Sequence, residues 1–396
     1  MACRIGPRCC LSIVFACFCV ELTGCGNGQK SARTTVLLMR HCVRSVPDSG
    51  VYAVAGFKYY NNYSATAWPA FDIPSEYCSS RGEQLAKGSG QWFKGHSPLT
   101  EPVRVIADNL ERNNISGRAF LTGYGQDVTE NNFLVDGSSF DPASTCDFYS
   151  HSEIAAFRQE QYEANPRPEP WTSQMMRKLY DVLGEGVAGN WTAVSCKTNN
   201  ESGFIDGSCS GASGFVERML MNWGSGLPVA WDRFQSWELP QLLNLNTWYR
   251  YVVFTVPKVV AKSDSSILRN VHETFQAGQA GTTVFVGHAR QLNAFNALGV
   301  SWDAAPYPVN ASLPSSVLRL ELEGGFVTGS YLFVTNFTDE TGDMTAVPVR
   351  FGTEERVPIA RFADLLTSGS DVSCANPLPK VAATRRESNM LRWSVV

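Results

Sequence analysis

Three short apolar segments rich in β-branched residues lie far apart along the chain. They are TTVLLM (34–39), VRVIA (103–107) and TTVFVG (282–287). A continuous apolar run of this length is typical of a strand buried on both faces of a parallel sheet. Polar residues follow each run directly: Arg40 and His41, then Asp108, then His288. Because ligands of open α/β sheets bind beyond the carboxyl ends of parallel strands, we expect these three ends to meet at one site.

The pattern changes to a helical period between the second and third of these strands. Apolar residues recur three and four positions apart in two stretches: Phe215, Met219, Leu220 and Trp223, and then Ile267, Leu268, Val271 and Phe275. Their simplest interpretation is the core-facing stripe of a helix. Three later segments are expected to extend the sheet as antiparallel strands: VLRLEL (317–322), YLFV (331–334) and VPVRF (347–351).

These elements predict an α/β protein with a helical insertion. The chain has 396 residues, which is enough for one large domain that carries a smaller one. We divide it into a discontinuous α/β core of residues 30–143 and 258–374, a helical cap or insertion of residues 144–257, and a polar tail of residues 375–396.

Residues 1–25 have the layout of a secretory signal peptide. Arg4 and Arg8 precede the apolar stretch 11–20, and small residues follow it. This stretch is about half the length that spans a bilayer, and no later segment is long and apolar enough, so we expect no transmembrane span. A secreted, extracellular or periplasmic protein is expected. The segment LTGC also resembles a lipoprotein cleavage box, which leaves acylation of Cys25 as an alternative.

Six cysteines lie beyond this leader: Cys42, Cys78, Cys146, Cys196, Cys209 and Cys374. An even number in an exported chain favours disulfides, and Cys196 and Cys209 bracket a polar loop as a natural local pair. No CxxC or Cys/His cluster indicates zinc. In a secreted protein from a eukaryotic source, N-x-[ST] sequons would favour glycosylation, and they occur at Asn62, Asn114, Asn190, Asn200, Asn310 and Asn336.

The charge balance argues against a nucleic-acid partner. The chain has 33 basic and 37 acidic side chains, a formal net charge of -4, and no Lys/Arg-rich tract. Binding to nucleic acid needs a concentrated basic face for the phosphates.

Arg40 and Arg44 flank His41 in the segment MRHCVRS, directly after the first predicted strand. Two guanidiniums beside one imidazole suit a phosphate or another oxyanion, because arginine offers planar, bidentate donors. Their charge would also lower the pKa of His41 and keep it neutral and nucleophilic at mildly acidic pH. A surface ion-pair cluster is the alternative, but the position after a buried strand favours a functional site.

The segment RHCVRSVP resembles the RHGxRxP signature of the histidine acid phosphatases, in the branch of bacterial periplasmic phytases and glucose-1-phosphatases. IADNLERNNISGRAF is similar to the ADxxERTxxTxxAF stretch of these enzymes, and WPAFDIPSEYCSSRGEQLA to their Trp-Pro segment. GHARQLNAFNALGVSWD takes the place of GHDTNLANLxxxL. The resemblance implies a phosphoglycerate-mutase-like three-layer sandwich, with a mainly parallel sheet and a smaller helical insertion domain.

The resemblance also implies roles for five residues. His41 would attack phosphorus to give a phosphohistidine, while Arg40, Arg44 and Arg112 bind the phosphoryl oxygens. His288 would donate a hydrogen bond to the phosphoryl group, although a core histidine is the simpler interpretation of this residue taken alone. A small phosphorylated substrate and an inorganic phosphate product follow, with no metal or organic cofactor.

For the cysteines, the family pattern suggests a pair of Cys146 with Cys374. Cys42 and Cys78 are absent from the family's motifs. They either pair near the mouth of the site or remain thiols.

Three positions depart from the family's motifs. Cys42 replaces the glycine of RHGxR, the proline falls one place late at Pro47, and Ala289 replaces the aspartate that protonates the leaving group. Losing a general acid costs about 10²- to 10⁴-fold in rate, or roughly 3 to 5 kcal/mol of barrier. The multiple inositol polyphosphate phosphatases use a glutamate one place later, where this chain has Arg290.

A carboxylate from elsewhere in the fold could approach the site in place of the missing one. Asp108, Glu273 and Asp303 are the candidates that the sequence offers.

Two functions compete. The first is an exported acid phosphatase that hydrolyses phosphate monoesters through a phosphohistidine on His41, with a weakened general-acid step. The alternative is a catalytically impaired pseudo-phosphatase that binds phosphorylated ligands, which Ala289 and Cys42 favour. A secreted structural glycoprotein is disfavoured, because Arg112 and His288 both follow predicted strands. Asp48 stands close after the signature, where phytases of the family often have lysine, which weakens a phytate-specific prediction.

Overall fold

The computed structural model describes residues 33–46, 64, 66–166, 171–183, 196–339 and 341–379. The predicted signal peptide with Cys25, the residues Pro47 and Asp48, the sequons at Asn62 and Asn190, and the tail beyond residue 379 lie outside the described residues. The described residues belong to one compact unit, Ala32–Val396.

The described part of the chain forms one large mixed sheet. Its strand order is β3-β2-β6-β1-β8-β9-β10-β7, and β11 pairs with β9. The first four strands are parallel to one another: β3 (Phe133–Val135), β2 (Val103–Ala107), β6 (Gly281–Gly287) and β1 (Thr34–Arg40). The remaining pairs are antiparallel: β8 (Val317–Glu323), β9 (Phe326–Val334), β10 (Met344–Phe351), β7 (Val300–Trp302) and β11 (Arg356–Pro358). The three predicted parallel strands and the three predicted antiparallel strands are confirmed.

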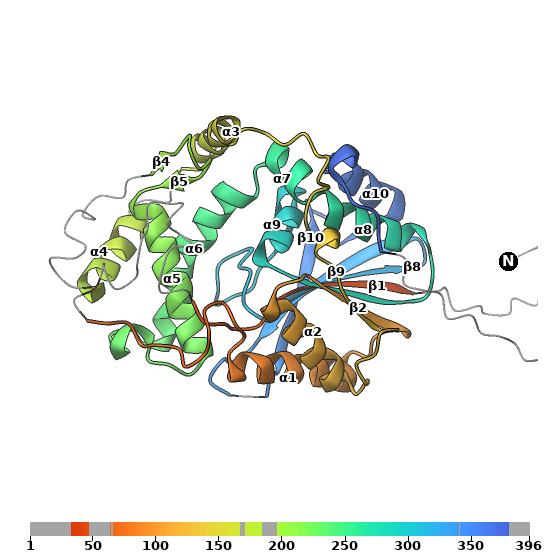
Figure 1. Cartoon of the computed structure of the whole chain (residues 1–396), viewed down its shortest axis with the longest axis horizontal. Helices are drawn as coiled ribbons and strands as arrows, with labels where there is room; N and C mark the ends of the chain where they lie inside the picture. The colour runs from red at the N-terminus through yellow and green to blue at the C-terminus, as the bar shows by residue number, and fades with distance from the viewer. Residues whose placement is uncertain are drawn as a thin grey trace, which may run out of the picture. The chain divides into compact units, whose positions relative to one another are not determined.

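Helices cover both faces of this sheet, which confirms the α/β class and the layered arrangement (Figure 1). One face carries α1 (Ser80–His96) and α2 (Glu111–Tyr124), and the other carries α8 (Ser265–Gln276), α9 (Ala289–Ala297) and α10 (Ile359–Ser368). Side chains alternate across β1, because successive residues of a strand point to opposite faces. Val36 and Leu38 pack with the core on the α8 side, and Leu37 and Met39 pack with the core on the α1 and α2 side.

The described part of the predicted insertion is mainly helical and includes a short hairpin (Figure 1). Its elements are α3 (His151–Ala164), α4 (Trp171–Leu183), β4 (Lys197–Thr198), β5 (Ile205–Asp206), α5 (Ser208–Gly224) and α6 (Leu239–Phe254), followed by α7 (Pro257–Ser263). Single 3₁₀ turns occupy Gly137–Ser139, Val229–Asp232, Ser236–Glu238 and Val372–Cys374. The stripe of Phe215, Met219 and Leu220 lies buried in α5, and the stripe from Ile267 lies in α8, so both helix predictions are confirmed.

Three disulfides join the six cysteines named above. Cys146 pairs with Cys374, Cys196 with Cys209, and Cys42 with Cys78. The first two pairs confirm the predictions. The third decides the open question for Cys42 and Cys78 in favour of a bridge, which ties the segment after β1 to the residues before α1. No helix in the described ranges has the length and apolarity to cross a membrane.

Candidate active site

The carboxyl ends of β1, β2 and β6 meet at one edge of the sheet. The register of these strands aligns their last residues, so His41, Asp108 and His288 leave the sheet beside one another. The backbone N–H of His41 donates to the carbonyl of Gly287 at 2.9 Å. The ring centroids of His41 and His288 are 5.3 Å apart. The expectation that these strand ends meet is confirmed.

His41 is held in one tautomer. Its Nδ1 lies 2.8 Å from the carbonyl oxygen of Cys42, and a carbonyl can only accept, so Nδ1 carries the proton. The lone pair of the ring is therefore on Nε2. Burial lowers the pKa of His41 well below its usual value, and the nearby charges of His288 and of three arginines lower it further. A buried, neutral imidazole with a free Nε2 lone pair can act as a nucleophile at acidic pH.

Arg40 is fixed by the insertion as well as by the sheet. It donates to the carbonyl oxygen of Ser312 and to the carboxylate of Glu217 on α5. Glu217 also accepts from Arg250 of α6 at 3.1 Å, and its side chain is only 2% exposed. Burial lowers the pKa of Arg40 to about 10, partly opposed by Glu217.

The pKa of Glu217 falls in spite of its burial. Burial alone would raise it, but the charges of Arg40 and Arg250 outweigh that effect and lower the pKa to about 2. Sequence reasoning missed this residue, which lies 177 positions from Arg40. Its signal is a single carboxylate within the apolar stripe of α5.

A second carboxylate, Glu76, lies against the other two arginines. It accepts from Nη1 of Arg112 at 3.1 Å, and its other oxygen lies 4.0 Å from Nη1 of Arg44. The side chain of Glu76 is 30% exposed, whereas those of Arg44 and Arg112 are 8% and 10% exposed. Sequence reasoning assigned no role to Glu76, because nothing in the pattern around it distinguishes it from a surface residue.

The segment that carries Glu76 is cross-linked to the segment that carries His41, and we call this connection the clip. The disulfide of Cys42 with Cys78 joins them, and the backbone N–H of Ser45 donates to the carbonyl of Tyr77 at 2.9 Å. Glu76 itself has a φ of 68°, a left-handed conformation that residues other than glycine rarely adopt. The clip therefore fixes where the Glu76 carboxylate lies relative to the arginines.

His288 is oriented by Asp108. Its Nε2 lies 2.9 Å from Oδ2 of Asp108 and 3.4 Å from the side-chain nitrogen of Asn113. Burial lowers the pKa of His288, and the hydrogen bond to Asp108 opposes this shift. Burial would raise the pKa of Asp108, but its hydrogen bond with His288 and the positive charges nearby outweigh burial and lower the pKa.

The two residues after His288 offer no acid. Ala289 is buried at the start of α9. The Nε of Arg290 donates to the buried carboxylate of Asp264 at 3.0 Å, and its Nη2 donates to the carbonyl of Phe140 at 3.1 Å. Arg290 is thus engaged in an ion pair with the loop between α7 and α8.

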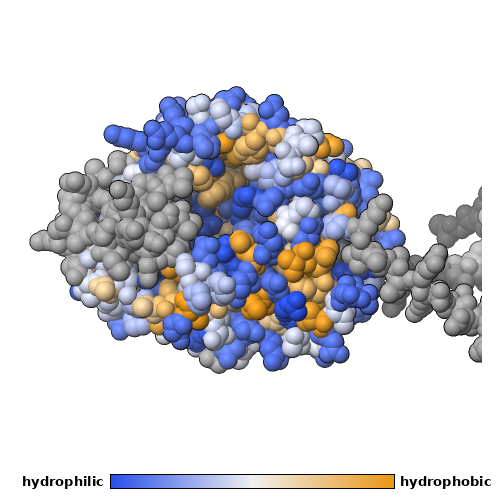
Figure 2. Space-filling model, viewed as in Figure 1, coloured by the Kyte–Doolittle hydropathy of each residue, from blue (hydrophilic) through white to orange (hydrophobic). Residues whose placement is uncertain are grey.

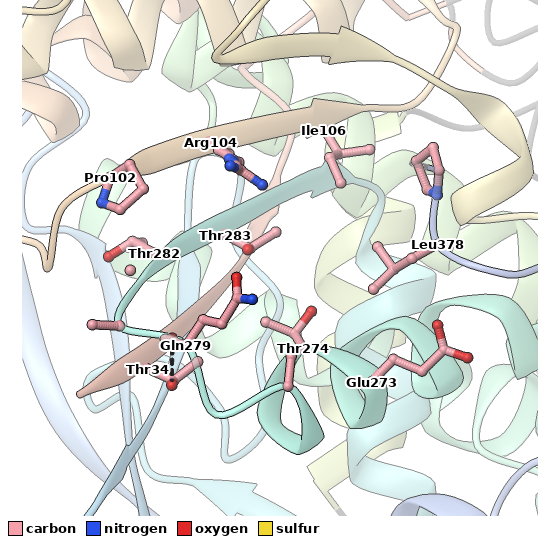
Figure 3. Close-up of a pocket in the computed structure, with 14 residues that line it drawn as sticks. Thr34, Pro102, Arg104, Ile106, Glu273, Thr274, Gln279, Thr282, Thr283 and Leu378 are labelled. Atoms are coloured by element: carbon pink, nitrogen blue, oxygen red, sulfur yellow. Dashed lines mark hydrogen bonds between the residues drawn. The ribbon is translucent and has the colours of Figure 1, made fainter. Parts of the chain in front are cut away.

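Of the three substitute carboxylates that the sequence offers, Asp108 alone is brought to the strand ends. Glu273 lies at the opposite edge of the sheet, where it lines a pocket of about 200 Å³ at the beginnings of β1, β2 and β6. Figure 3 shows Glu273 on α8 in this pocket, with Arg104 of β2 and Thr34 of β1 on its other walls. Asp303 is exposed and accepts a hydrogen bond from the backbone of Ala305 at 3.3 Å.

Buried donors remain at this edge. The Nε atoms of Arg40 and Arg112 are buried and have no hydrogen-bond partner within the described part of the chain. Buried N–H groups are nearly always paired, so the described residues leave the hydrogen-bonding capacity of these two donors unused. Figure 2 shows that the face seen in this view is hollowed near its middle, among hydrophilic residues. Among the described residues, no three His, Cys, Asp or Glu side chains form a metal-binding group.

Comparisons with known proteins agree with this geometry. No family model matches the chain. A curated relative, the glucose-1-phosphatase of Salmonella typhimurium, is 23% identical over 286 residues, which cover 62% of this chain and 66% of the relative.

Three solved phytases have the same fold as this chain. The phytase of Citrobacter braakii is 20% identical with a TM-score of 0.69, and the match covers 88% of this chain and all of the phytase. The phytase of Hafnia alvei bound to tartrate is 16% identical with a TM-score of 0.70, and the match covers 88% and 99% of the two chains. The Klebsiella sp. ASR1 phytase is 16% identical with a TM-score of 0.71, and the match covers 88% and 98%.

The fold is thus the α/β fold of the bacterial phytases, with the layered sheet and the helical insertion that the resemblance implies. In sequence the chain is similar to a glucose-1-phosphatase, and its fold is the one that the resemblance to the histidine acid phosphatases implies.

Proposed function

We propose that this protein is an exported acid phosphatase that hydrolyses phosphate monoesters through a phosphohistidine on His41. The observation that carries the proposal is the state of His41: buried, neutral, with its lone pair on Nε2, and surrounded by the arginine side chains. Nε2 attacks phosphorus, the bond from phosphorus to the ester oxygen breaks, and the oxygen leaves with the electron pair and takes up a proton. Water then attacks the phosphohistidine and releases inorganic phosphate.

Arg40, Arg44 and Arg112 bind the phosphoryl oxygens in this proposal. Glu217 and the carbonyl of Ser312 hold Arg40 in place, which leaves its buried Nε–H for the ligand. Preorganised charges of this kind stabilise the transition state, because they need no rearrangement as charge moves to the oxygens. His288 donates its Nε2 hydrogen bond to the phosphoryl group in exchange for Asp108.

Export is supported by the three disulfides and by the leader predicted from the sequence. An acidic working range is compatible with His41, because burial and the nearby positive charges hold its pKa well below its usual value. A small phosphorylated compound is the expected substrate class, in agreement with the curated relative. The domain division into a core and a cap of residues 144–257 remains part of this proposal.

The test is a pair of measurements on an aryl phosphate such as 4-nitrophenyl phosphate. Its leaving group departs without protonation, so turnover depends on His41 and the arginines alone. We expect the wild type to cleave it and to give a base-stable, acid-labile phosphoryl label after rapid quenching with base. His41→Ala should lose both, whereas His96→Ala, a change at an exposed histidine of α1, should keep both. Turnover by His41→Ala would reject the nucleophile.

The second candidate function is a catalytically impaired pseudo-phosphatase that binds phosphorylated ligands. Ala289 and the engagement of Arg290 by Asp264 favour it, because neither position can supply the family's proton donor. Phosphate binding by the wild type, without turnover of the aryl phosphate, would decide in its favour.

A further inference from the structure

We propose that Glu76 is the proton donor to the leaving group, in the role that the residue at position 289 has lost. This inference rests on the proposed function. Among the described residues, Glu76 is the site carboxylate that contacts Arg112 and is also partly open to solvent.

The position of Glu76 suits the leaving-group side of an in-line displacement. The nucleophile His41 is 3% exposed and forms the floor of the site. The leaving group departs opposite to the nucleophile, which is toward solvent. Glu76 is 30% exposed and contacts Arg112 at 3.1 Å, so a phosphoryl group held by Arg112 would have this carboxyl next to it on the outer side. A general acid must lie within hydrogen-bond reach of the atom that it protonates.

The other two carboxylates of the site are poor proton donors. Glu217 lies buried between Arg40 and Arg250, and its pKa is lowered to about 2. The carboxylate of Asp108 is only 6% exposed, so it is shielded from the solvent side to which the leaving group departs, and in the free protein its pKa is also lowered. Neither carboxylate therefore offers a proton on the solvent side of the site.

Substrate binding changes the charges around Glu76. Among the described residues, Glu76 contacts the charged groups of Arg44, on the segment after β1, and Arg112, on α2. Glu111 of α2 accepts from the backbone N–H of Cys78, two residues further along the same segment. A phosphate dianion takes the two guanidiniums away from Glu76 and places negative charge beside it. A carboxylate that loses its cations and gains an anionic neighbour binds a proton more tightly.

The step balances within the site. The proton passes from the Glu76 carboxyl to the ester oxygen as the bond from that oxygen to phosphorus breaks, and the electron pair of the bond stays on oxygen. Glu76 is left as a carboxylate. It can then take a proton from the water that attacks the phosphohistidine, which restores the acid for the next cycle.

The clip around Glu76 supports this role, because an acid must be held in place. The disulfide of Cys42 with Cys78 joins the Glu76 segment to the residue that follows His41. Glu76 keeps a left-handed backbone, with a φ of 68°, that is unfavourable for glutamate. Unfavourable backbone conformations persist where the surrounding structure imposes them, and they gather at functional sites.

The experiment compares an alkyl phosphate, glycerol 3-phosphate, with 4-nitrophenyl phosphate in Glu76→Gln. Glutamine keeps the shape and, through Oε1, can still accept the hydrogen bond from Arg112, but it has no acidic proton to give to a leaving group. We expect kcat for the alkyl phosphate to fall about 10²- to 10⁴-fold, the size of a general-acid contribution, and kcat for the aryl phosphate to fall less than 10-fold. Glu76→Asp, which keeps a carboxyl, should recover part of the alkyl activity. Glu130→Gln, at an exposed glutamate in the turn before β3, is the matched control and should change neither rate.

Three results would overturn the inference while leaving the phosphatase intact. The ratio of alkyl to aryl activity could stay unchanged in Glu76→Gln, both activities could rise because Glu76 merely competes with phosphate, or the wild type could cleave only the aryl ester. A wild type that cleaves neither ester contradicts the proposed function itself, and the role of Glu76 falls with it.

Discussion

Within the described residues, two carboxylates contact the arginines of the site from different parts of the molecule, and they differ in burial. Glu217 comes from α5 of the insertion, is 2% exposed and is shared by Arg40 and Arg250. Glu76 comes from the segment between β1 and α1, is 30% exposed and is shared by Arg112 and Arg44. Both pairings place one negative charge between two guanidiniums.

The difference in burial separates their roles. Glu217 is buried between the buried Arg40 and the partly buried Arg250, so it stays ionised and in place, because an uncompensated charge there would be desolvated. It is a positioning residue for Arg40. A partly exposed carboxylate can exchange its cations for water or for a proton at little cost. The buried pair therefore fixes Arg40 in place. The partly exposed pair gives Arg112 and Arg44 a carboxylate that a ligand can replace.

The largest expected effect is that of Glu217→Ala. It leaves the buried Arg40 and the partly buried Arg250 without their carboxylate, and breaking a buried pair such as Arg40 with Glu217 costs about 3 to 5 kcal/mol of unfolding free energy. Aryl phosphatase activity should fall about 10²-fold or more, as when one charge-stabilising donor is removed. Urea unfolding and steady-state kinetics measure the two effects. If Glu217→Ala lowered the unfolding free energy by less than about 1 kcal/mol, burial would not distinguish Glu217 from Glu76.

The same residue predicts a pH dependence of stability. The pKa of Glu217 is about 2 in the folded chain, against an ordinary value of 4.5, so the unfolded chain binds more protons between these values. Its contribution is complete above about pH 4.5 and is lost as the pH falls toward about 2. Glu217→Gln should have a flatter dependence of unfolding free energy on pH in this window. Equal slopes in the two proteins would contradict the assignment.

Another prediction concerns the disulfide that holds the Glu76 segment against the residues after His41. Replacing Cys42 with Ala and Cys78 with Ser should cost about 2 to 4 kcal/mol of stability, the usual contribution of such a bridge. It should also lower the alkyl activity more than the aryl activity, because Glu76 is no longer held against Arg112. Cys196→Ser with Cys209→Ser is the control: it also removes a bridge, but in the insertion, and should lower stability without changing the ratio of the two activities. If the ratio of alkyl to aryl activity also changed in this control, the effect of losing the Cys42–Cys78 bridge could not be assigned to Glu76.

The sequence predicts much of the fold, because the information is local. The three apolar runs that become β1, β2 and β6 are short, rich in β-branched residues and end at polar residues, so both the strands and the meeting of their ends can be inferred. Arg40, His41 and His288 could be placed at this edge for the same reason. The stripes of α5 and α8 follow from their helical period.

The carboxylates of the site could not be predicted, because they depend on packing between distant segments. Glu217 reaches Arg40 across 177 positions, and only the docking of α5 brings them together. Glu76 lies in a segment whose apolar residues follow neither a helical nor a strand period. Its position depends on the disulfide of Cys42 with Cys78, which the sequence alone could not decide. Glu273, in contrast, lies on a correctly predicted helix but at the other edge of the sheet.

A third prediction restores the family's acid. Ala289 opens α9 directly after His288, where an aspartate is also favoured by the helix N-terminus. In the Glu76→Gln background, Ala289→Asp should recover alkyl phosphatase activity by about 10-fold or more, which corresponds to about 1.4 kcal/mol of barrier. In the wild-type background the gain should be smaller, because Glu76 already supplies the proton. Equal gains in both backgrounds would mean that the two carboxyls do not serve the same step.

The smallest expected effect is on stability in Glu76→Gln. A partly exposed ion pair contributes about 0 to 1 kcal/mol, so the unfolding free energy should change by less than about 1 kcal/mol. The difference should shrink further in about 1 M salt, where charges more than a few ångströms apart are screened. The Glu217 variants should keep their loss in the same salt, since that pair is buried. Urea unfolding at low and high salt measures both variants side by side. A large loss of unfolding free energy in Glu76→Gln that does not depend on salt would make Glu76 a structural partner of Arg112 rather than a replaceable one.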